Sequence, residues 1–126
     1  MPMAVAKRRV LLVDDVADVR FLHRLALERD GRFEIVGEAA DGAEGVELAA
    51  ALQPDSVVLD LLMPKVDGLT ALPRIRAAAP GATVVICSAV RNADVVEQAA
   101  SLGAAAFFDK GDPLEHLADL LAGPTD

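Results

Sequence analysis

Short apolar runs alternate along the chain with longer stretches of mixed polarity. The runs are Val10–Val13, Phe33–Val36, Val57–Leu59, Thr83–Cys87 and Ala105–Phe108. Because neighbouring positions within the runs are mostly apolar, with Glu34 and Thr83 as exceptions, we expect both faces of each strand to be buried, as in the interior of a parallel sheet. Two-residue hairpin turns do not occur between the runs, so we expect parallel rather than antiparallel pairing.

The stretches between the runs have the apolar spacing of helices, with apolar residues recurring every three or four positions. They cover Val16–Glu28, Asp41–Leu52, Gly68–Ala79, Asn92–Leu102 and Pro113–Leu121. Each is long enough for a right-handed crossover between parallel strands. The pattern therefore predicts an α/β fold: a (βα)5 doubly wound, five-stranded parallel sheet of the flavodoxin type.

Local features refine three of these helices. The first helix carries one apolar stripe, formed by Val16, Val19, Leu22 and Leu25 or Ala26. The second opens on Asp41 and Glu44, which match a capping box. Pro73 lies inside the third helix, where the missing hydrogen bond costs about 3 kcal/mol. We therefore expect a kink or a late start in that helix.

The length of 126 residues suits one domain. We expect a single domain over residues 1–126, with a core of about 8–122 and no effector domain in the chain. The net charge of −8 disfavours binding to nucleic acid or anionic lipid. The single Cys87 cannot form an internal disulfide, which favours a reduced, cytoplasmic setting. No apolar run approaches the ~20 residues that cross a bilayer.

Polar side chains follow four of the five apolar runs directly. They are Asp14 and Asp15, Asp60, Ser88, and Asp109 with Lys110. The carboxyl ends of parallel strands meet at one edge of the sheet, so we expect these side chains to gather there. Three clustered carboxylates repel one another unless a cation lies among them, and hard oxygen ligands suit Mg²⁺.

A carboxylate beside Mg²⁺ can also act as a nucleophile toward phosphorus and form an aspartyl phosphate. The transferred group carries charge on three oxygens, so such a site needs a cation and a hydroxyl or amide donor. Lys110 and Ser88 supply these two groups at strand ends. The set as a whole points to phosphoryl transfer.

The chain resembles the response-regulator receiver domains of two-component signalling. The residues that carry the resemblance are Val13–Asp15 with Arg20, Asp60–Leu69, Ser88–Ala89 and Phe107–Lys110. Two further segments, Glu34–Gly42 and Gly103–Phe107, are similar to receivers of the NarL and LuxR-type subfamily.

The resemblance implies a role for each strand-end residue. Asp60 would be the phosphoacceptor. The ligands of Mg²⁺ would be Asp14, Asp15, Asp60 and the backbone carbonyl of Leu62. Ser88 and Lys110 would contact the phosphoryl group, and Ser88 with Phe107 would form the switch. The domain would be a phosphoacceptor rather than an enzyme, with at most slow self-dephosphorylation.

The resemblance also implies partners. The phosphoryl donor would be a histidine kinase or a phosphotransfer protein. A downstream protein or a second copy of the chain would bind the face formed by about Asn92–Leu121. We expect no direct contact with nucleic acid or membrane.

Three positions depart from the family pattern. Lys110 is followed by Gly111 rather than Pro, so we do not expect the usual cis peptide there. Phe107 lacks the hydroxyl that many receivers carry. Leu62, two residues after the acceptor, offers no polar atom to position an attacking water, which predicts a slow loss of phosphate.

Other functions remain open at the level of the sequence. The chain could be the N-terminal receiver half of a DNA-binding transcriptional regulator. It could also be a Mg²⁺-dependent phosphohydrolase with an aspartyl nucleophile, although such enzymes usually carry a second acid where this chain has Leu62. A receiver-like interaction domain without phosphorylation is the third alternative, and the intact acidic set argues against it.

Overall fold

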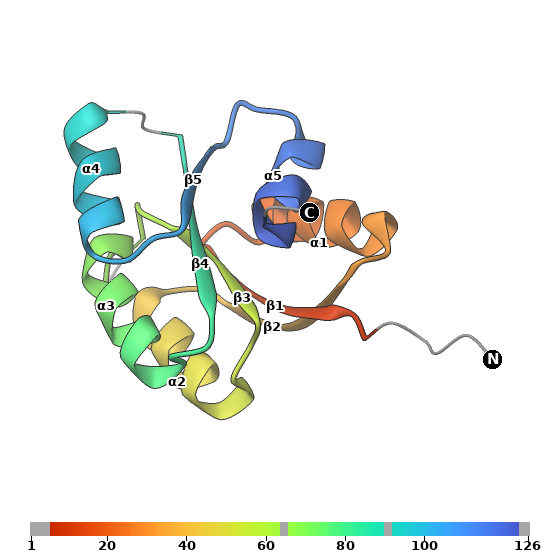
Figure 1. Cartoon of the computed structure of the whole chain (residues 1–126), viewed down its shortest axis with the longest axis horizontal. Helices are drawn as coiled ribbons and strands as arrows, with labels where there is room; N and C mark the ends of the chain where they lie inside the picture. Colours follow the sequence, from red (N-terminus) through yellow and green to blue (C-terminus); the bar gives the residue numbers. More distant parts are fainter. Residues whose placement is uncertain (1–5, 64–65, 90–91, 124–126) are drawn as a thin grey trace.

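A computed structural model describes residues 6–63, 66–89 and 92–123. Within these ranges the chain forms alternating strands and helices (Figure 1). The strands are β1 (Arg8–Val13), β2 (Phe33–Ala39), β3 (Ser56–Asp60), β4 (Thr83–Ser88) and β5 (Ala106–Asp109). The helices are α1 (Ala17–Asp30), α2 (Gly42–Leu52), α3 (Gly68–Ala78), α4 (Ala93–Ser101) and α5 (Leu114–Ala122).

All strand pairs are parallel, and the order in the sheet is β2-β1-β3-β4-β5. The predicted doubly wound fold is therefore confirmed. Helices α2, α3 and α4 cover one face of the sheet, and α1 and α5 cover the other (Figure 1). This arrangement brings the ends of β1, β3, β4 and β5 to one edge, where the strand-end residues meet.

Alternate residues of the central strands pack in two separate apolar cores, one on each face of the sheet. Leu59 and Ile86 belong to the core under α2, α3 and α4. Val58 and Cys87 belong to the core under α1 and α5. Because side chains alternate between the faces of a strand, this division fixes the side of the sheet to which each strand-end residue belongs.

The sequence-based expectation of strands buried on both faces is correct for β1, β3 and β4 and wrong for the two edge strands. The central residues of β2 are only half-buried, and three of the four residues of β5 are half-buried. Both strands lie at an edge of the sheet and have one paired side only. An apolar run of this length does not by itself distinguish a central strand from an edge strand.

The helix starts follow from capping side chains. Asp41 accepts the N–H of Glu44 at 2.8 Å, and Glu44 accepts the N–H of Ala40 at 3.1 Å, which confirms the expected box with a shift of one residue. Asp67 accepts the N–H of Thr70 at 2.8 Å. This cap starts α3 at Gly68, so the expected late start is wrong and the helix continues through Pro73.

The apolar stripe predicted for the first helix is only partly packed, because Val19 and Ala26 are half-buried while its other residues are exposed. Phe21 is 58% exposed and Leu22 is 52% exposed, and Val16 and Leu25 are also exposed. The residues of α1 that are buried are His23 and Leu27. No helix in the described part of the chain has the length and apolar character needed to cross a membrane.

Candidate functional site

Lys110 joins two of the predicted carboxylates at the carboxyl edge of the sheet. Its Nζ lies 3.0 Å from Oδ2 of Asp14 and 3.3 Å from Oδ2 of Asp60. Asp14 follows β1, Asp60 ends β3, and Lys110 follows β5, so three strands contribute to one cluster. Both carboxylates are buried, with Asp60 only 3% exposed.

The backbone groups and Oδ1 of Asp14 have hydrogen-bond partners, and among the described residues its Oδ2 has only the ion pair with Lys110. Its N–H donates to the carbonyl of Ala39 at 3.0 Å. Oδ1 accepts the N–H of Val16 at 2.9 Å, and Oδ2 faces Lys110. The backbone carbonyl accepts a guanidinium N–H of Arg20 at 2.6 Å. The residue is therefore fixed in position, as expected for a group that orients a ligand.

Asp15 completes the acidic group from the solvent side. Asp14, Asp15 and Asp60 each place one carboxylate oxygen so that the three atoms lie within 4.8 Å of one another. Asp15 is exposed, while the other two are buried. The three strand-end carboxylates predicted to converge are thus brought together, with one open side.

The surroundings of Asp60 disfavour its charged form, whereas those of Lys110 favour the charged ammonium. Burial raises the pKa of Asp60, the charge of Asp14 raises it further, and Lys110 and a hydrogen bond from the N–H of Leu62 only partly oppose the rise. Burial alone would lower the pKa of Lys110. The hydrogen bond to Asp14 and the charge of Asp60 outweigh that effect, so the pKa lies above its ordinary value.

Ser88 and Phe107 lie toward the opposite side of the sheet. Ile86 and Phe107 pack in the core under α2, α3 and α4, and Ser88 follows Ile86 by two residues. Ser88 is fully buried, and Phe107 is half-buried. Both residues therefore share the α4 side of β4 and β5, while Asp60 follows Val58 on the α1 side.

The loop after β5 is ordered without the usual proline. The N–H of Lys110 donates to the carbonyl of Ser88 at 3.0 Å. Oδ1 of Asp109 accepts the N–H of Gly111 at 2.8 Å. Peptide bonds in the described residues are all trans, as expected for a Lys-Gly pair. A short Asp-based turn therefore places the Lys110 side chain over the acidic cluster.

The segment that follows Asp60 is described only in part. Leu62 is 63% exposed at the rim of the site. Pro64 and Lys65, which belong to the segment that carries the family resemblance, lie outside the described residues.

Two contacts at the site were not predicted from the sequence. The sequence places Arg20 in the motif without a role, and in the structure its guanidinium donates to the Asp14 carbonyl. His23 is buried below the cluster, 4.0 Å from Sγ of Cys87 and edge-on to the ring of Phe108. Burial lowers the pKa of His23, which favours the neutral ring. The spacing of five residues between Asp15 and Arg20 was the available signal for the first contact.

The chain belongs to the response regulator receiver domain family, whose sequence profile matches residues 10–122. It is 42% identical over 104 residues to a protein-glutamate methylesterase/protein-glutamine glutaminase of Maricaulis maris. That match covers 81% of this chain but 26% of the relative, so the chain spans about a quarter of that protein.

Two solved structures show the same fold. The signal receiver domain of the putative response regulator NarL from Mycobacterium tuberculosis superposes with a TM-score of 0.85 at 34% identity, covering 94% of this chain and 98% of that chain. The CheX–CheY–BeF3–Mg²⁺ complex from Borrelia burgdorferi contains a chain with a TM-score of 0.76 and 31% identity, with 87% of this chain and 83% of that chain covered. These matches confirm the resemblance stated from the sequence.

Proposed function

We propose that Asp60 accepts a phosphoryl group from a phosphorylated histidine and that Lys110, with Ser88, contacts the group once it is transferred. The observation that carries the proposal is the Lys110 ammonium, which bridges Asp14 and Asp60 at the carboxyl edge of the sheet. A fixed cation beside the acceptor stabilises the charge that develops on the phosphoryl oxygens.

Mg²⁺ fits the donor set of this site. Three carboxylate oxygens within 4.8 Å of one another are hard ligands, and the exposed side at Asp15 leaves room for water. Asp14, Asp15, Asp60 and the Leu62 carbonyl would hold the ion, which supplies positive charge to the phosphoryl oxygens. The Borrelia CheY that shares the fold is described in a complex with Mg²⁺ and BeF3.

The proposed output runs through Ser88 and Phe107 to the face formed by about Asn92–Leu121. Phe107 lines a cavity of about 100 Å³ together with α4 residues such as Val96 and Ala99. This space allows the ring to change its position when Ser88 moves toward a phosphoryl group. The partner on this face would be a downstream protein or a second copy of the chain.

The setting we propose is the cytoplasm, with a histidine kinase or phosphotransfer protein as donor. The family match over residues 10–122 supports the expected receiver core of about 8–122. An acceptor role is favoured over a phosphohydrolase because the exposed, apolar Leu62 stands where such hydrolases carry a second acid. The methylesterase activity in the name of the Maricaulis relative is not proposed for this chain, which spans about a quarter of that protein.

The proposal is tested by adding Mg²⁺ with acetyl phosphate or with beryllofluoride and recording the mass and the ¹H–¹⁵N spectrum. We expect the wild type to gain a phosphoryl group from acetyl phosphate and to shift its amide signals with beryllofluoride. Asp60→Ala should do neither. Glu47→Gln, which neutralises an exposed carboxylate of α2 instead of a strand-end carboxylate, should behave as wild type. Modification that persists in Asp60→Ala would overturn the site.

Replacing Leu62 with Asn should speed the loss of phosphate by roughly an order of magnitude, because the amide can hold a water in line with the acyl phosphate. Leu62 is 63% exposed, so the new side chain needs no repacking of the core. The measurement is the decay of ³²P-labelled protein after removal of the donor. Leu62→Met, which stays apolar, serves as the control. Equal decay rates in wild type and Leu62→Asn would contradict the prediction.

A further inference from the structure

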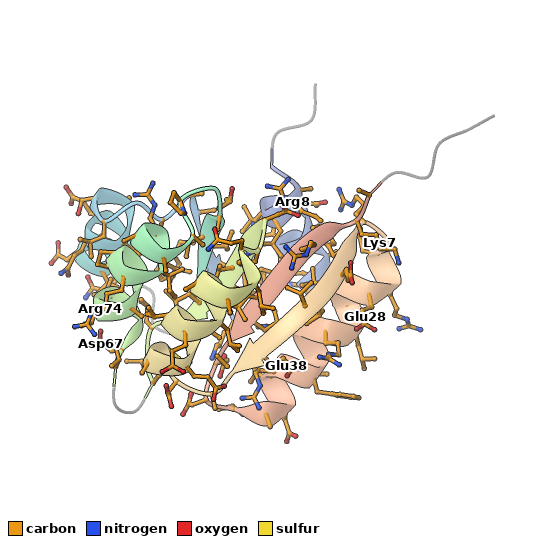
Figure 2. The ribbon with its side chains drawn as sticks, turned by 90° about the horizontal axis from the view of Figure 1, so that it is seen from below. Lys7, Arg8, Glu28, Glu38, Asp67 and Arg74 are labelled. Carbon is orange, nitrogen blue, oxygen red and sulfur yellow. The ribbon has the colours of Figure 1, made fainter. Side chains whose placement is uncertain are left out.

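Both backbone groups of Asp14 are tied to the end of β2. The N–H donates to the carbonyl of Ala39, and the carbonyl accepts a guanidinium N–H of Arg20 at 2.6 Å. The same guanidinium donates through Nε to Oε1 of Glu38 at 3.0 Å. Figure 2 shows Glu38 close to the end of β2, beside α1. Arg20 therefore links the loop after β1 to a side chain of the neighbouring strand.

The carbonyl that Arg20 holds belongs to the peptide group between Asp14 and Asp15. A peptide group is planar, so fixing its oxygen also fixes the direction in which the chain enters Asp15. Apart from this peptide group Asp15 is exposed, whereas Asp14 is also held by Val16 and Lys110. The backbone orientation of Asp15 therefore depends on the Arg20 contact more strongly than the backbone orientation of Asp14 or Asp60 does.

The positive charge of Arg20 is balanced by the carboxylate of Glu38. Glu38 forms ion pairs with Arg20 and with Arg24, and the side chains of Arg20 and Glu38 are mostly buried. An Arg with a carboxylate partner can orient a backbone oxygen without presenting a free positive charge to an incoming cation.

We propose that Arg20, oriented by Glu38, is a positioning residue that presets the Asp14–Asp15 peptide group for binding of a divalent cation. The inference rests on the proposed function, since the cation is the one that the acidic cluster would hold. Arg20 touches neither the acceptor carboxylate nor the cation, and it acts through the direction of Asp15.

The test compares Arg20→Met with Arg24→Met. Arg24 is a matched control because it pairs with the same Glu38 carboxylate but has no contact with Asp14 among those the structure gives. Mg²⁺ affinity is measured by calorimetry, and unfolding by urea is measured in parallel. We expect Arg20→Met to weaken Mg²⁺ binding about tenfold, in the range found for residues that orient metal ligands. Arg24→Met should bind Mg²⁺ within twofold of wild type.

A second readout does not depend on the metal. The ¹⁵N order parameter of the Asp15 amide in the metal-free protein should fall in Arg20→Met and stay unchanged in Arg24→Met. Arg20→Lys, which reaches the Asp14 carbonyl but lacks the planar fork that also binds Glu38, should give intermediate values for both readouts. Glu38→Gln should weaken Mg²⁺ binding less than Arg20→Met, and the double variant should be no weaker than Arg20→Met alone.

The outcomes separate this inference from the proposed function. If the wild type binds neither Mg²⁺ nor beryllofluoride, the proposed function fails. The positioning role alone is overturned by either of two results in a wild type that binds both. In the first, Arg20→Met binds Mg²⁺ within twofold of wild type. In the second, Arg24→Met loses as much Mg²⁺ affinity as Arg20→Met. At saturating Mg²⁺, Arg20→Met should still take up beryllofluoride on Asp60.

Discussion

Replacing Lys110 with Met should lower the free energy of unfolding of the metal-free protein by about 2 to 3 kcal/mol at neutral pH. The ammonium pairs with the buried carboxylates of Asp14 and Asp60, and its removal leaves two like charges facing each other. The expected loss lies below that of a fully buried pair, because Lys110 is 21% exposed. Urea unfolding followed by far-ultraviolet circular dichroism measures the effect, since the chain has no Trp or Tyr.

A double variant identifies the cause of that loss. In Lys110→Met with Asp60→Asn only one buried carboxylate remains, so we expect at least half of the lost stability to return. Mg²⁺ should restore stability to Lys110→Met for the same reason, since binding to the folded state raises its stability. A single Lys110→Met variant as stable as wild type would show that the cluster is not strained by repulsion between Asp14 and Asp60.

Gly68→Ala should destabilise the protein by about 3 kcal/mol or more, at the upper end of the cost of overpacking. A Cβ at Gly68 would lie 2.3 Å from the carbonyl oxygen of Asp60 and 2.7 Å from Cα of Leu61. Both are backbone atoms, so Asp60 at the end of β3 and the adjoining Leu61 must move. The N–H of Gly68 also donates to Leu61 at 2.9 Å. We therefore expect slower uptake of phosphate from acetyl phosphate, in addition to the loss of stability.

Gly81→Ala is the matched control for this substitution. A Cβ at Gly81 meets no atom within 4 Å, and the residue does not have a positive φ. Its stability should be unchanged or higher by up to about 1 kcal/mol, since Ala restricts the unfolded chain. If Gly68→Ala matched Gly81→Ala in urea unfolding and in phosphate uptake, the close approach of α3 to β3 would have no energetic consequence.

The strand-end residues could be predicted from the sequence because the order and direction of the strands determine where each strand ends in the fold. Asp14, Asp60 and Lys110 are far apart in sequence, yet each follows an apolar run of a parallel sheet. In such a fold the carboxyl ends of the strands share one edge. That rule brings Asp14, Asp60 and Lys110 to one edge, while the contacts of Lys110 with both carboxylates also need the turn at Asp109, which the rule does not predict. Their roles in phosphoryl transfer stay predictions until the variants are measured.

The packed face of α1 could not be predicted from the same pattern. Periodicity identifies a stripe of apolar residues, but it does not say whether the sheet covers that stripe. Here His23 fills the buried position and lies edge-on to Phe108, while Phe21 and Leu22 remain exposed. The spacing of apolar residues counts only apolar side chains, so it gives no indication that His23 is buried. The apolar face of the His23 ring suits the core, and burial lowers the pKa of the ring, which favours its neutral form.

The two-sided core has a consequence for how a chemical change at Asp60 could reach the α4 side. Asp60 opens toward the α1 side, and Ser88 and Phe107 lie toward the α4 side, with the buried middle of β3 and β4 between them. The described residues in the middle of β3 and β4 are buried apolar side chains, which pack densely. In the proposed mechanism the conformational change passes through the residues at the carboxyl ends of the strands, which we call the rim of the sheet. Substitutions deep in β3 or β4 should therefore alter stability without severing communication, whereas changes at the rim should do the reverse.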